Sequence, residues 1–249
     1  MYRYALTIEY DGSPFHGWQV QNSITTVQGV VFDAIKKLDM NCENFVGAGR
    51  TDAGVHAIGQ VAHVDLATKR DCETVQKAIN YYLNKYPVSI LNARLVNNQF
   101  HARFSAIKRH YIYKIFSRKT ALTFEKNQYW HVRHSLNKSN MQLAANYLTG
   151  RHDFSAFRSS ICQASSPIKT IDTISIQSEE IRDGVVYQLN FSARSFLHHQ
   201  VRSIVGCLEK VGCGKWGAKK IQEILLSKDR SRCAALAPSG GLYLARIDY

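Results

Sequence analysis

The sequence lacks the segments that place a protein in or across a membrane. It contains no apolar run of the ~20 residues that a membrane-spanning helix needs. Its start has no apolar core of the kind found in a secretion signal, and instead alternates in polarity like a strand. We therefore expect a cytoplasmic protein without a membrane partner.

The cysteines are few and do not cluster. There are six, at positions 42, 72, 162, 207, 213 and 233, and no two form a Cys-x-x-Cys pair. A disulfide framework is not expected in a chain of this size without a secretion signal. A zinc site needs clustered ligands, and the spacing of His198 and His199 from Cys207 and Cys213 fits no usual pattern. The sequence thus predicts no metal site.

Acidic residues are also scarce. The chain has 19 Asp and Glu against 32 Lys and Arg, which gives a net charge of +13 and a pI near 9.5. Such an excess favours a polyanionic partner, although a merely basic protein without one is the simpler alternative. Basic and aromatic residues are interleaved in Phe100–Phe104 and Arg109–Lys114. Rings that stack on unpaired bases, beside charges that meet phosphates, are typical of RNA-binding proteins.

Patterns of polarity divide the chain into two α+β halves. Hydrophobic residues make up 45% of the 249 residues, enough for one large domain or two smaller ones. Alternation predicts strands at 2–10, 60–65, 88–96, 110–117, 170–176, 185–193 and 242–247. Helical spacing predicts helices at 26–38, 71–83, 139–148, 198–211 and 218–226. No linker rich in Pro, Gly or Ser separates the halves. We expect domains at 1–105 and 106–249, each a sheet covered by helices, meeting at a central basic cleft.

Residues 47–65 are the most informative stretch. They read Gly-Ala-Gly-Arg-Thr-Asp-Ala-Gly-Val-His-Ala-Ile-Gly-Gln-Val-Ala-His-Val-Asp, with Asp52 directly after Arg50 and Thr51. Glycines let the backbone approach a ligand closely, and an adjacent guanidinium would hold Asp52 ionised. An ionised carboxylate on a constrained loop is a candidate nucleophile or base. The alternative is an ordinary polar turn.

The glycines do not form a nucleotide-binding loop. Gly49-x-x-x-x-Gly54 has Walker spacing, but Val55-His56 follows where Lys and Ser or Thr are required. The Gly47-x-Gly49 pair lacks the third glycine of the dinucleotide fingerprint, because Ala53 stands in its place. ATP and NAD are therefore not expected.

Several residues allow two interpretations. His56 and His63 could be acid–base groups, but hydrogen-bonded histidines flanking a strand are favoured. Tyr111, on a predicted strand, is by default a core residue. Arg202 lies among apolar residues of a predicted helix. If buried it needs a counter-ion, for which Asp52 is one candidate; otherwise it is a surface arginine whose stem covers apolar atoms.

At this point the residues resemble a known family. Gly49-Arg-Thr-Asp-Ala-Gly-Val-His-Ala57 with Gly59-Gln60 is similar to the catalytic motif of the tRNA pseudouridine synthase A family. Further blocks resemble it in the same order: Glu9-Tyr-Asp-Gly with Gly17-Trp-Gln, Thr26-Val-Gln, Phe100-His-Ala-Arg-Phe-Ser-Ala106, Arg109-x-Tyr111-x-Tyr113, His152-Asp-Phe with Phe157, Phe196-Leu-His-His-Gln-Val-Arg202, and Ala237-Pro with Gly241-Leu-Tyr-Leu244. One departure is Phe32, where family members often carry Glu.

The resemblance implies the pseudouridine synthase fold, with mainly antiparallel sheets, and a homodimer. It implies isomerisation of uridine to pseudouridine at positions 38, 39 and 40 of the tRNA anticodon arm. No atom enters or leaves overall, so no cofactor is expected. A non-catalytic tRNA-binding protein or RNA chaperone would explain the charge but not the Asp52 loop. A glycoside or nucleoside hydrolase would normally need two carboxylates.

The resemblance also assigns roles to residues. It makes Asp52 the catalytic carboxylate, which we expect to act as the nucleophile; attack at C6, attack at C1′ and assistance of a glycal route remain open. The positive charges of Arg50 and Arg202 would hold Asp52 ionised. Tyr111 would stack on the flipped base. The other expected substrate-binding residues are Arg103, Arg109 and His56.

Overall fold

The computed structural model describes all residues, 1–249, and the chain divides into two compact units. Unit 1 comprises Met1–Ile107 and Tyr243–Tyr249, and unit 2 comprises Lys108–Leu242. Each unit combines a mainly antiparallel sheet with α-helices, so the predicted α+β class is confirmed. No helix has the length and apolar character needed to cross a membrane.

The sheet of unit 1 is built around β3, its longest strand. Its strands are β1 (Tyr2–Tyr10), β2 (Glu43–Gly47), β3 (His56–Leu66), β4 (Val88–Leu95) and β10 (Leu242–Asp248). They lie in the order β4-β1-β3-β10, and β2 pairs with β3. All these pairings are antiparallel except the parallel pairing of β3 with β10. Along β1, Tyr4, Leu6 and Ile8 are fully buried on one face, which explains the alternating sequence.

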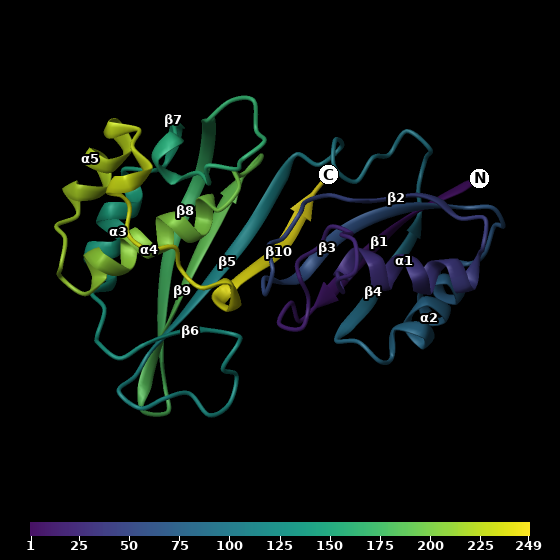
Figure 1. The fold of residues 1–249 in the computed structure, drawn as a ribbon, viewed down its shortest axis with the longest axis horizontal. Helices are drawn as coiled ribbons and strands as arrows, with labels where there is room; N and C mark the ends of the chain where they lie inside the picture. The colour runs from purple at the N-terminus through teal and green to yellow at the C-terminus, as the bar shows by residue number, and fades with distance from the viewer. The chain divides into compact units, whose positions relative to one another are not determined.

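Two helices of unit 1 begin where capping residues predict. Thr26 caps α1 (Val27–Leu38) by accepting a hydrogen bond from the backbone N–H of Gly29. Asp71 caps α2 (Cys72–Leu83), accepting from Glu73 and Thr74. Helix α2 packs against β4, and α1 packs against α2 (Figure 1).

The last strand belongs to unit 1, although sequence order placed residues 106–249 together in the second domain. Tyr243 and Leu244 of β10 pair with the start of β3. The Tyr249 hydroxyl donates to the Ala102 carbonyl at 2.8 Å, and the Ile107 N–H donates to the Asp248 carbonyl at 2.9 Å. The chain thus leaves unit 1 after Ile107 and returns to it at its end, a long-range pairing that strand periodicity does not encode.

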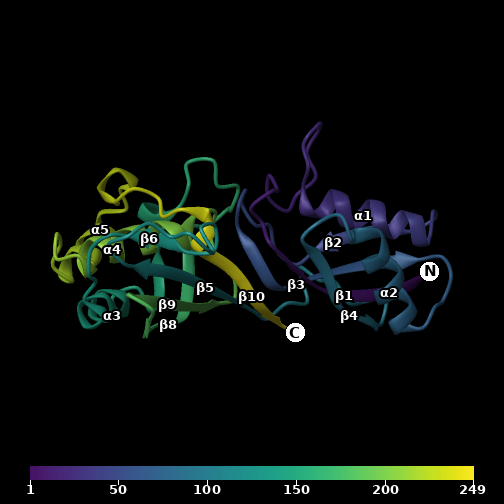
Figure 2. The same cartoon turned by 90° about the horizontal axis from the view of Figure 1, so that it is seen from below.

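Unit 2 contains the other five strands, which pair mainly in antiparallel fashion. Its strands are β5 (Lys108–Ser117), β6 (Trp130–Val132), β7 (Gly150–Asp153), β8 (Ile168–Ile181) and β9 (Gly184–Ala193). The order is β5-β9-β8-β7, with β6 added parallel to β5. Its helices are α3 (Lys138–Asn146), α4 (Gln200–Gly212) and α5 (Lys219–Ser227), and Figure 2 shows them from a second direction. Helix α3 packs against both α4 and β8.

Helix α4 begins two residues later than the apolar spacing predicts. His199 has a left-handed backbone conformation, with φ of 66°, and so it cannot be part of the helix. The Ser203 N–H still donates to the His199 carbonyl at 2.9 Å, which makes His199 the N-cap. Arg202 therefore lies in the first turn of α4.

Candidate functional site

The loop between β2 and β3 holds Asp52 in a fixed backbone frame. Its neighbours on both sides are anchored: the Trp18 N–H donates to the Thr51 carbonyl at 3.0 Å, and the Gly54 N–H donates to the Phe15 carbonyl at 3.3 Å. The Asp52 carbonyl itself accepts from the Val55 N–H at 3.1 Å. The Asp52 side chain is half-buried. The loop is therefore an ordered turn that presents a carboxylate.

Two glycines are required by this arrangement. Gly54 has a φ of 74°, in the left-handed region that favours glycine. At Gly47, a Cβ atom would lie 2.6 Å from the Trp18 indole, so the ring could not pack there. The glycines thus shape and pack the loop, which agrees with the failure of both nucleotide-loop patterns.

Side-chain contacts beneath the loop add to its order. The Thr51 hydroxyl is buried and hydrogen-bonds the Tyr10 hydroxyl at 2.8 Å. Gln60 donates from Nε2 to the Gly49 carbonyl at 2.8 Å. Sequence reasoning did not identify Tyr10 or Trp18 as supports, although both stand in or beside family-like blocks.

Arg50 is exposed, and its Nε donates to Oε1 of Gln19 at 3.1 Å. This hydrogen bond keeps the guanidinium close to the loop, and its acceptor is an amide oxygen and not a carboxylate. The expected role of Arg50 as a counter-ion of Asp52 stays a prediction.

His56 is a buried, hydrogen-bonded histidine at the start of β3. Its Nδ1 accepts from the Gly12 N–H at 3.0 Å and lies 3.1 Å from Oδ1 of Asp11. Its ring stacks on Tyr243 at 4.7 Å between centroids. Burial alone would raise the pKa of Asp11, but hydrogen bonds from Ser13 and the nearby His56 outweigh it and lower that pKa. Contact of His56 with a substrate stays a prediction.

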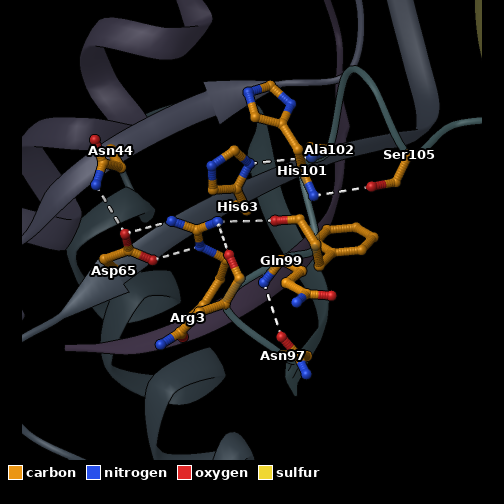
Figure 3. Close-up of polar contacts among 11 residues, drawn as sticks. Arg3, Asn44, His63, Asp65, Asn97, Gln99, His101, Ala102 and Ser105 are labelled. Carbon is orange, nitrogen blue, oxygen red and sulfur yellow. Dashed lines mark hydrogen bonds and ion pairs between the residues drawn. The ribbon is translucent and has the colours of Figure 1, made fainter.

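His63, the second histidine of the motif, lies in a polar network with Arg3 and Asp65 (Figure 3). Arg3 and Asp65 form a bidentate ion pair, with Nε–Oδ1 and Nη2–Oδ2 distances of 2.7 Å. The His63 Nδ1 accepts from the Ala102 N–H at 3.1 Å. Burial, followed by the charges of Arg3 and His101, lowers the pKa of His63 to about 4. His63 is therefore a neutral structural acceptor, as the favoured interpretation predicts.

This histidine makes folding pH-dependent. The pKa of His63 is about 4 in the folded chain against an ordinary 6.5, so the unfolded chain binds more protons between those values. We expect the free energy of unfolding to fall by about 3 kcal/mol as the pH drops from 6.5 to 4. Urea unfolding at a series of pH values measures this change.

His63→Asn keeps an acceptor near the Ala102 N–H and removes the titration, so its unfolding free energy should vary less across the same pH range. The control is His16→Asn, because His16 is exposed. Asp65 contributes outside this range, since its pKa is lowered from 3.8, chiefly by the hydrogen bond from Arg3. An equal pH slope in wild type and His63→Asn would contradict the prediction.

Three predicted site residues lie in unit 2. Arg202 is half-buried in the first turn of α4, and its Nε donates to the Ala237 carbonyl at 2.8 Å. The Tyr113 hydroxyl donates to the next carbonyl, Pro238, at 2.7 Å. Burial raises the pKa of Tyr113, and the charge of Arg202 partly offsets this rise. Arg202 and Tyr113 thus converge on the Ala237-Pro block.

The other two are on β5. Tyr111 is half-buried and meets Phe196 edge-on, with ring centroids 5.2 Å apart. Arg109 donates from Nη1 to the Arg194 carbonyl at 2.7 Å. The last predicted residue, Arg103, is exposed in unit 1, with its guanidinium 5.6 Å from the Phe104 ring centroid.

One cluster in unit 2 has the residue types of a metal site. The ligand atoms of His134, Glu209 and Cys213 lie within 4.8 Å of one another. However, Nε2 of His134 lies 2.8 Å from one oxygen of the buried Glu209 carboxylate, and Nζ of Lys210 lies 2.9 Å from the other. Because Lys210 already balances the charge of the carboxylate, the cluster is best described as an ion pair between the buried Glu209 and Lys210, with His134 hydrogen-bonded beside it.

Comparison with known proteins identifies the family. A family model described as tRNA pseudouridine synthase matches residues 6–105 and 144–249. The chain therefore belongs to the tRNA pseudouridine synthase family and has its fold, as the motifs predict.

Relatives that align with the whole chain carry a more specific name than the family model. The protein named tRNA pseudouridine synthase A from Maricaulis maris is 49% identical over 249 residues, covering 100% of this chain and 98% of that protein. Those of the same name from Parvibaculum lavamentivorans and Xanthobacter autotrophicus are 49% and 47% identical, and each alignment covers 100% of both chains.

Proposed function

We propose that the protein isomerises uridine to pseudouridine at positions 38, 39 and 40 of the tRNA anticodon arm. The observation that carries this proposal is Asp52, a half-buried carboxylate held on an ordered loop in a member of the tRNA pseudouridine synthase family. The basic composition of the chain, with a net charge of +13, suits an RNA substrate.

The reaction breaks the C1′–N1 bond, turns the base and forms a C1′–C5 bond. The C5 proton leaves and N1 gains a proton, so no atom is gained or lost overall and no cofactor is required. The target base must first leave the stack, at a cost of a few kcal/mol. In this proposal Asp52 is the nucleophile, while Arg50 and Arg202 favour its ionised form.

The remaining roles concern the substrate. Tyr111 stacks on the flipped uracil; its edge-on contact with Phe196 supports the ring from one side. Arg103 and Arg109 bind phosphates, and His56 lines the substrate site from the start of β3. In this proposal the protein acts in the cytoplasm and forms a homodimer. Light scattering of the purified protein tests the dimer.

The direct test is to incubate the purified protein with an unmodified tRNA transcript and map pseudouridine by carbodiimide treatment and primer extension. We expect primer-extension stops that report pseudouridine at positions 38, 39 and 40, and no such stops in a transcript with cytidine at these positions. Binding without any stop would favour a non-catalytic tRNA-binding protein. Release of free uracil would instead indicate a hydrolase.

A further inference from the structure

The loop that follows β4 ends in an exposed aromatic tip. Phe104 has 74% of its surface exposed, although it is a large apolar side chain. The Arg103 guanidinium lies 5.6 Å from its ring centroid, and the His101 ring lies 4.4 Å away. A phenyl ring, a guanidinium and an imidazole are thus presented together.

The backbone of this tip is ordered. The His101 N–H donates to the Ser105 hydroxyl at 3.0 Å, and the Ser105 N–H donates back to the His101 carbonyl at 2.9 Å. The N–H groups of Arg103 and Phe104 both point to Nδ1 of His101, at 3.2 and 3.3 Å. Four hydrogen bonds therefore fix the turn from which Phe104 projects.

A polar network holds the base of the loop, as Figure 3 shows. Nη1 of Arg3 donates to the carbonyls of Asn98 and Phe100, at 2.6 and 3.0 Å. The same guanidinium is locked by Asp65, which also accepts from Asn44 at 2.8 Å. Together with the bond from Ala102 to His63, these contacts make the loop a rigid extension of the sheet of unit 1.

A single exposed apolar side chain is common and does not by itself indicate a partner. Phe104 differs because its turn is fixed by hydrogen bonds and its ring lies beside a guanidinium and an imidazole. Its position is explained if the ring meets a partner. The neighbouring arginine and the net charge of +13 point to a nucleic acid in preference to a second copy of this basic chain.

We propose that Phe104 is a stacking platform for an unpaired base of the tRNA substrate, away from the uridine that reacts. Arg103 binds the adjoining phosphate, and the Arg3–Asp65–His63 network positions the loop. The proposal rests on the proposed function for the identity of the RNA. Stacking on an aromatic ring tolerates any base, so the platform supplies affinity without sequence preference.

The test compares Phe104→Ala with Phe124→Ala. Phe124 is a matched control because it is also a largely exposed phenylalanine, at 71%. We expect Phe104→Ala to raise the Kd for unmodified tRNA about 10- to 100-fold in filter binding, and Phe124→Ala to leave it unchanged. Phe104→Trp should restore binding. At saturating tRNA, the rate of pseudouridine formation by Phe104→Ala should stay within about threefold of wild type, since stacking acts on binding.

An unchanged Kd for Phe104→Ala, with a melting temperature equal to that of wild type, would overturn the proposal. A lower molecular mass of Phe104→Ala than of wild type in light scattering would also overturn it, because the partner of Phe104 would then be a second copy of the chain. Filter binding needs no turnover. A wild-type protein that binds tRNA through Phe104 but forms no pseudouridine would therefore refute the proposed function and leave the platform intact.

Discussion

Replacing Asp52 by asparagine is expected to lower pseudouridine formation by more than about a thousandfold. Asparagine has nearly the same shape but can act neither as a nucleophile nor as a base. The loop should keep its conformation, because asparagine preserves the backbone hydrogen bonds that the Thr51 and Asp52 carbonyls accept from Trp18 and Val55. Release of tritium from C5-labelled uridine in tRNA measures the effect.

Measuring the affinity for tRNA separates a loss of catalysis from a loss of folding. Asp52→Asn should retain a Kd for tRNA within about threefold of wild type, because the proposed phosphate contacts come from arginines elsewhere. Asp33→Asn is the matched control, since Asp33 is an exposed carboxylate on α1, and it should release tritium at the wild-type rate. Tritium release by Asp52→Asn near the wild-type rate would remove Asp52 from the mechanism.

The helices were predictable because their signals are local. Thr26 and Asp71 mark the starts of α1 and α2, and the apolar spacing that follows each cap agrees with the buried face. The exception is the start of α4, where the left-handed conformation of His199 overrides an apolar pattern that continues backwards. Periodicity reports burial and not backbone conformation, so it could not locate this boundary.

Strands were less predictable where they are short or paired over long distances. Strand β2 was not predicted, because only Phe45 among its five residues is buried and no alternation is visible. The pairing of β10 with β3 joins the end of the chain to unit 1, and it depends on Gly59, where a Cβ atom would clash with the Ala245 carbonyl. The sequence shows the glycine but does not show which strand lies against it.

The candidate site was likewise predictable only where its features are local in the sequence. The residue types and spacing of Arg50-Thr51-Asp52 identified the loop, because that chemistry is contained in consecutive residues. The hydrogen bonds of the predicted arginines in the two units could not be predicted: Arg50 bonds Gln19, and Arg202 bonds the Ala237 carbonyl. A long, flexible side chain has many rotamers, and the tertiary surroundings select among them.

Replacing Asp65 by asparagine is expected to lower the free energy of unfolding of unit 1 by about 3 kcal/mol. The ion pair with Arg3 is nearly buried, with side-chain exposures of 15% for Arg3 and 7% for Asp65. Asparagine keeps the volume but leaves the guanidinium without its counter-charge, and an uncompensated buried charge is strongly unfavourable. Urea unfolding followed by Trp18 fluorescence measures the change, with Trp130 and Trp216 replaced by Phe so that the signal comes from unit 1 alone.

An exposed ion pair provides the control. Glu73 and Lys77 on α2 are 69% and 74% exposed, so Glu73→Gln should change stability by less than about 0.5 kcal/mol. The double variant Arg3→Met, Asp65→Leu tests the cause, because removing both charges should be less damaging than removing one. If Asp65→Asn unfolds like Glu73→Gln, water has access to the Arg3 guanidinium. The loop bearing Phe104 would then be held chiefly by the hydrogen bonds of His63, His101 and Ser105.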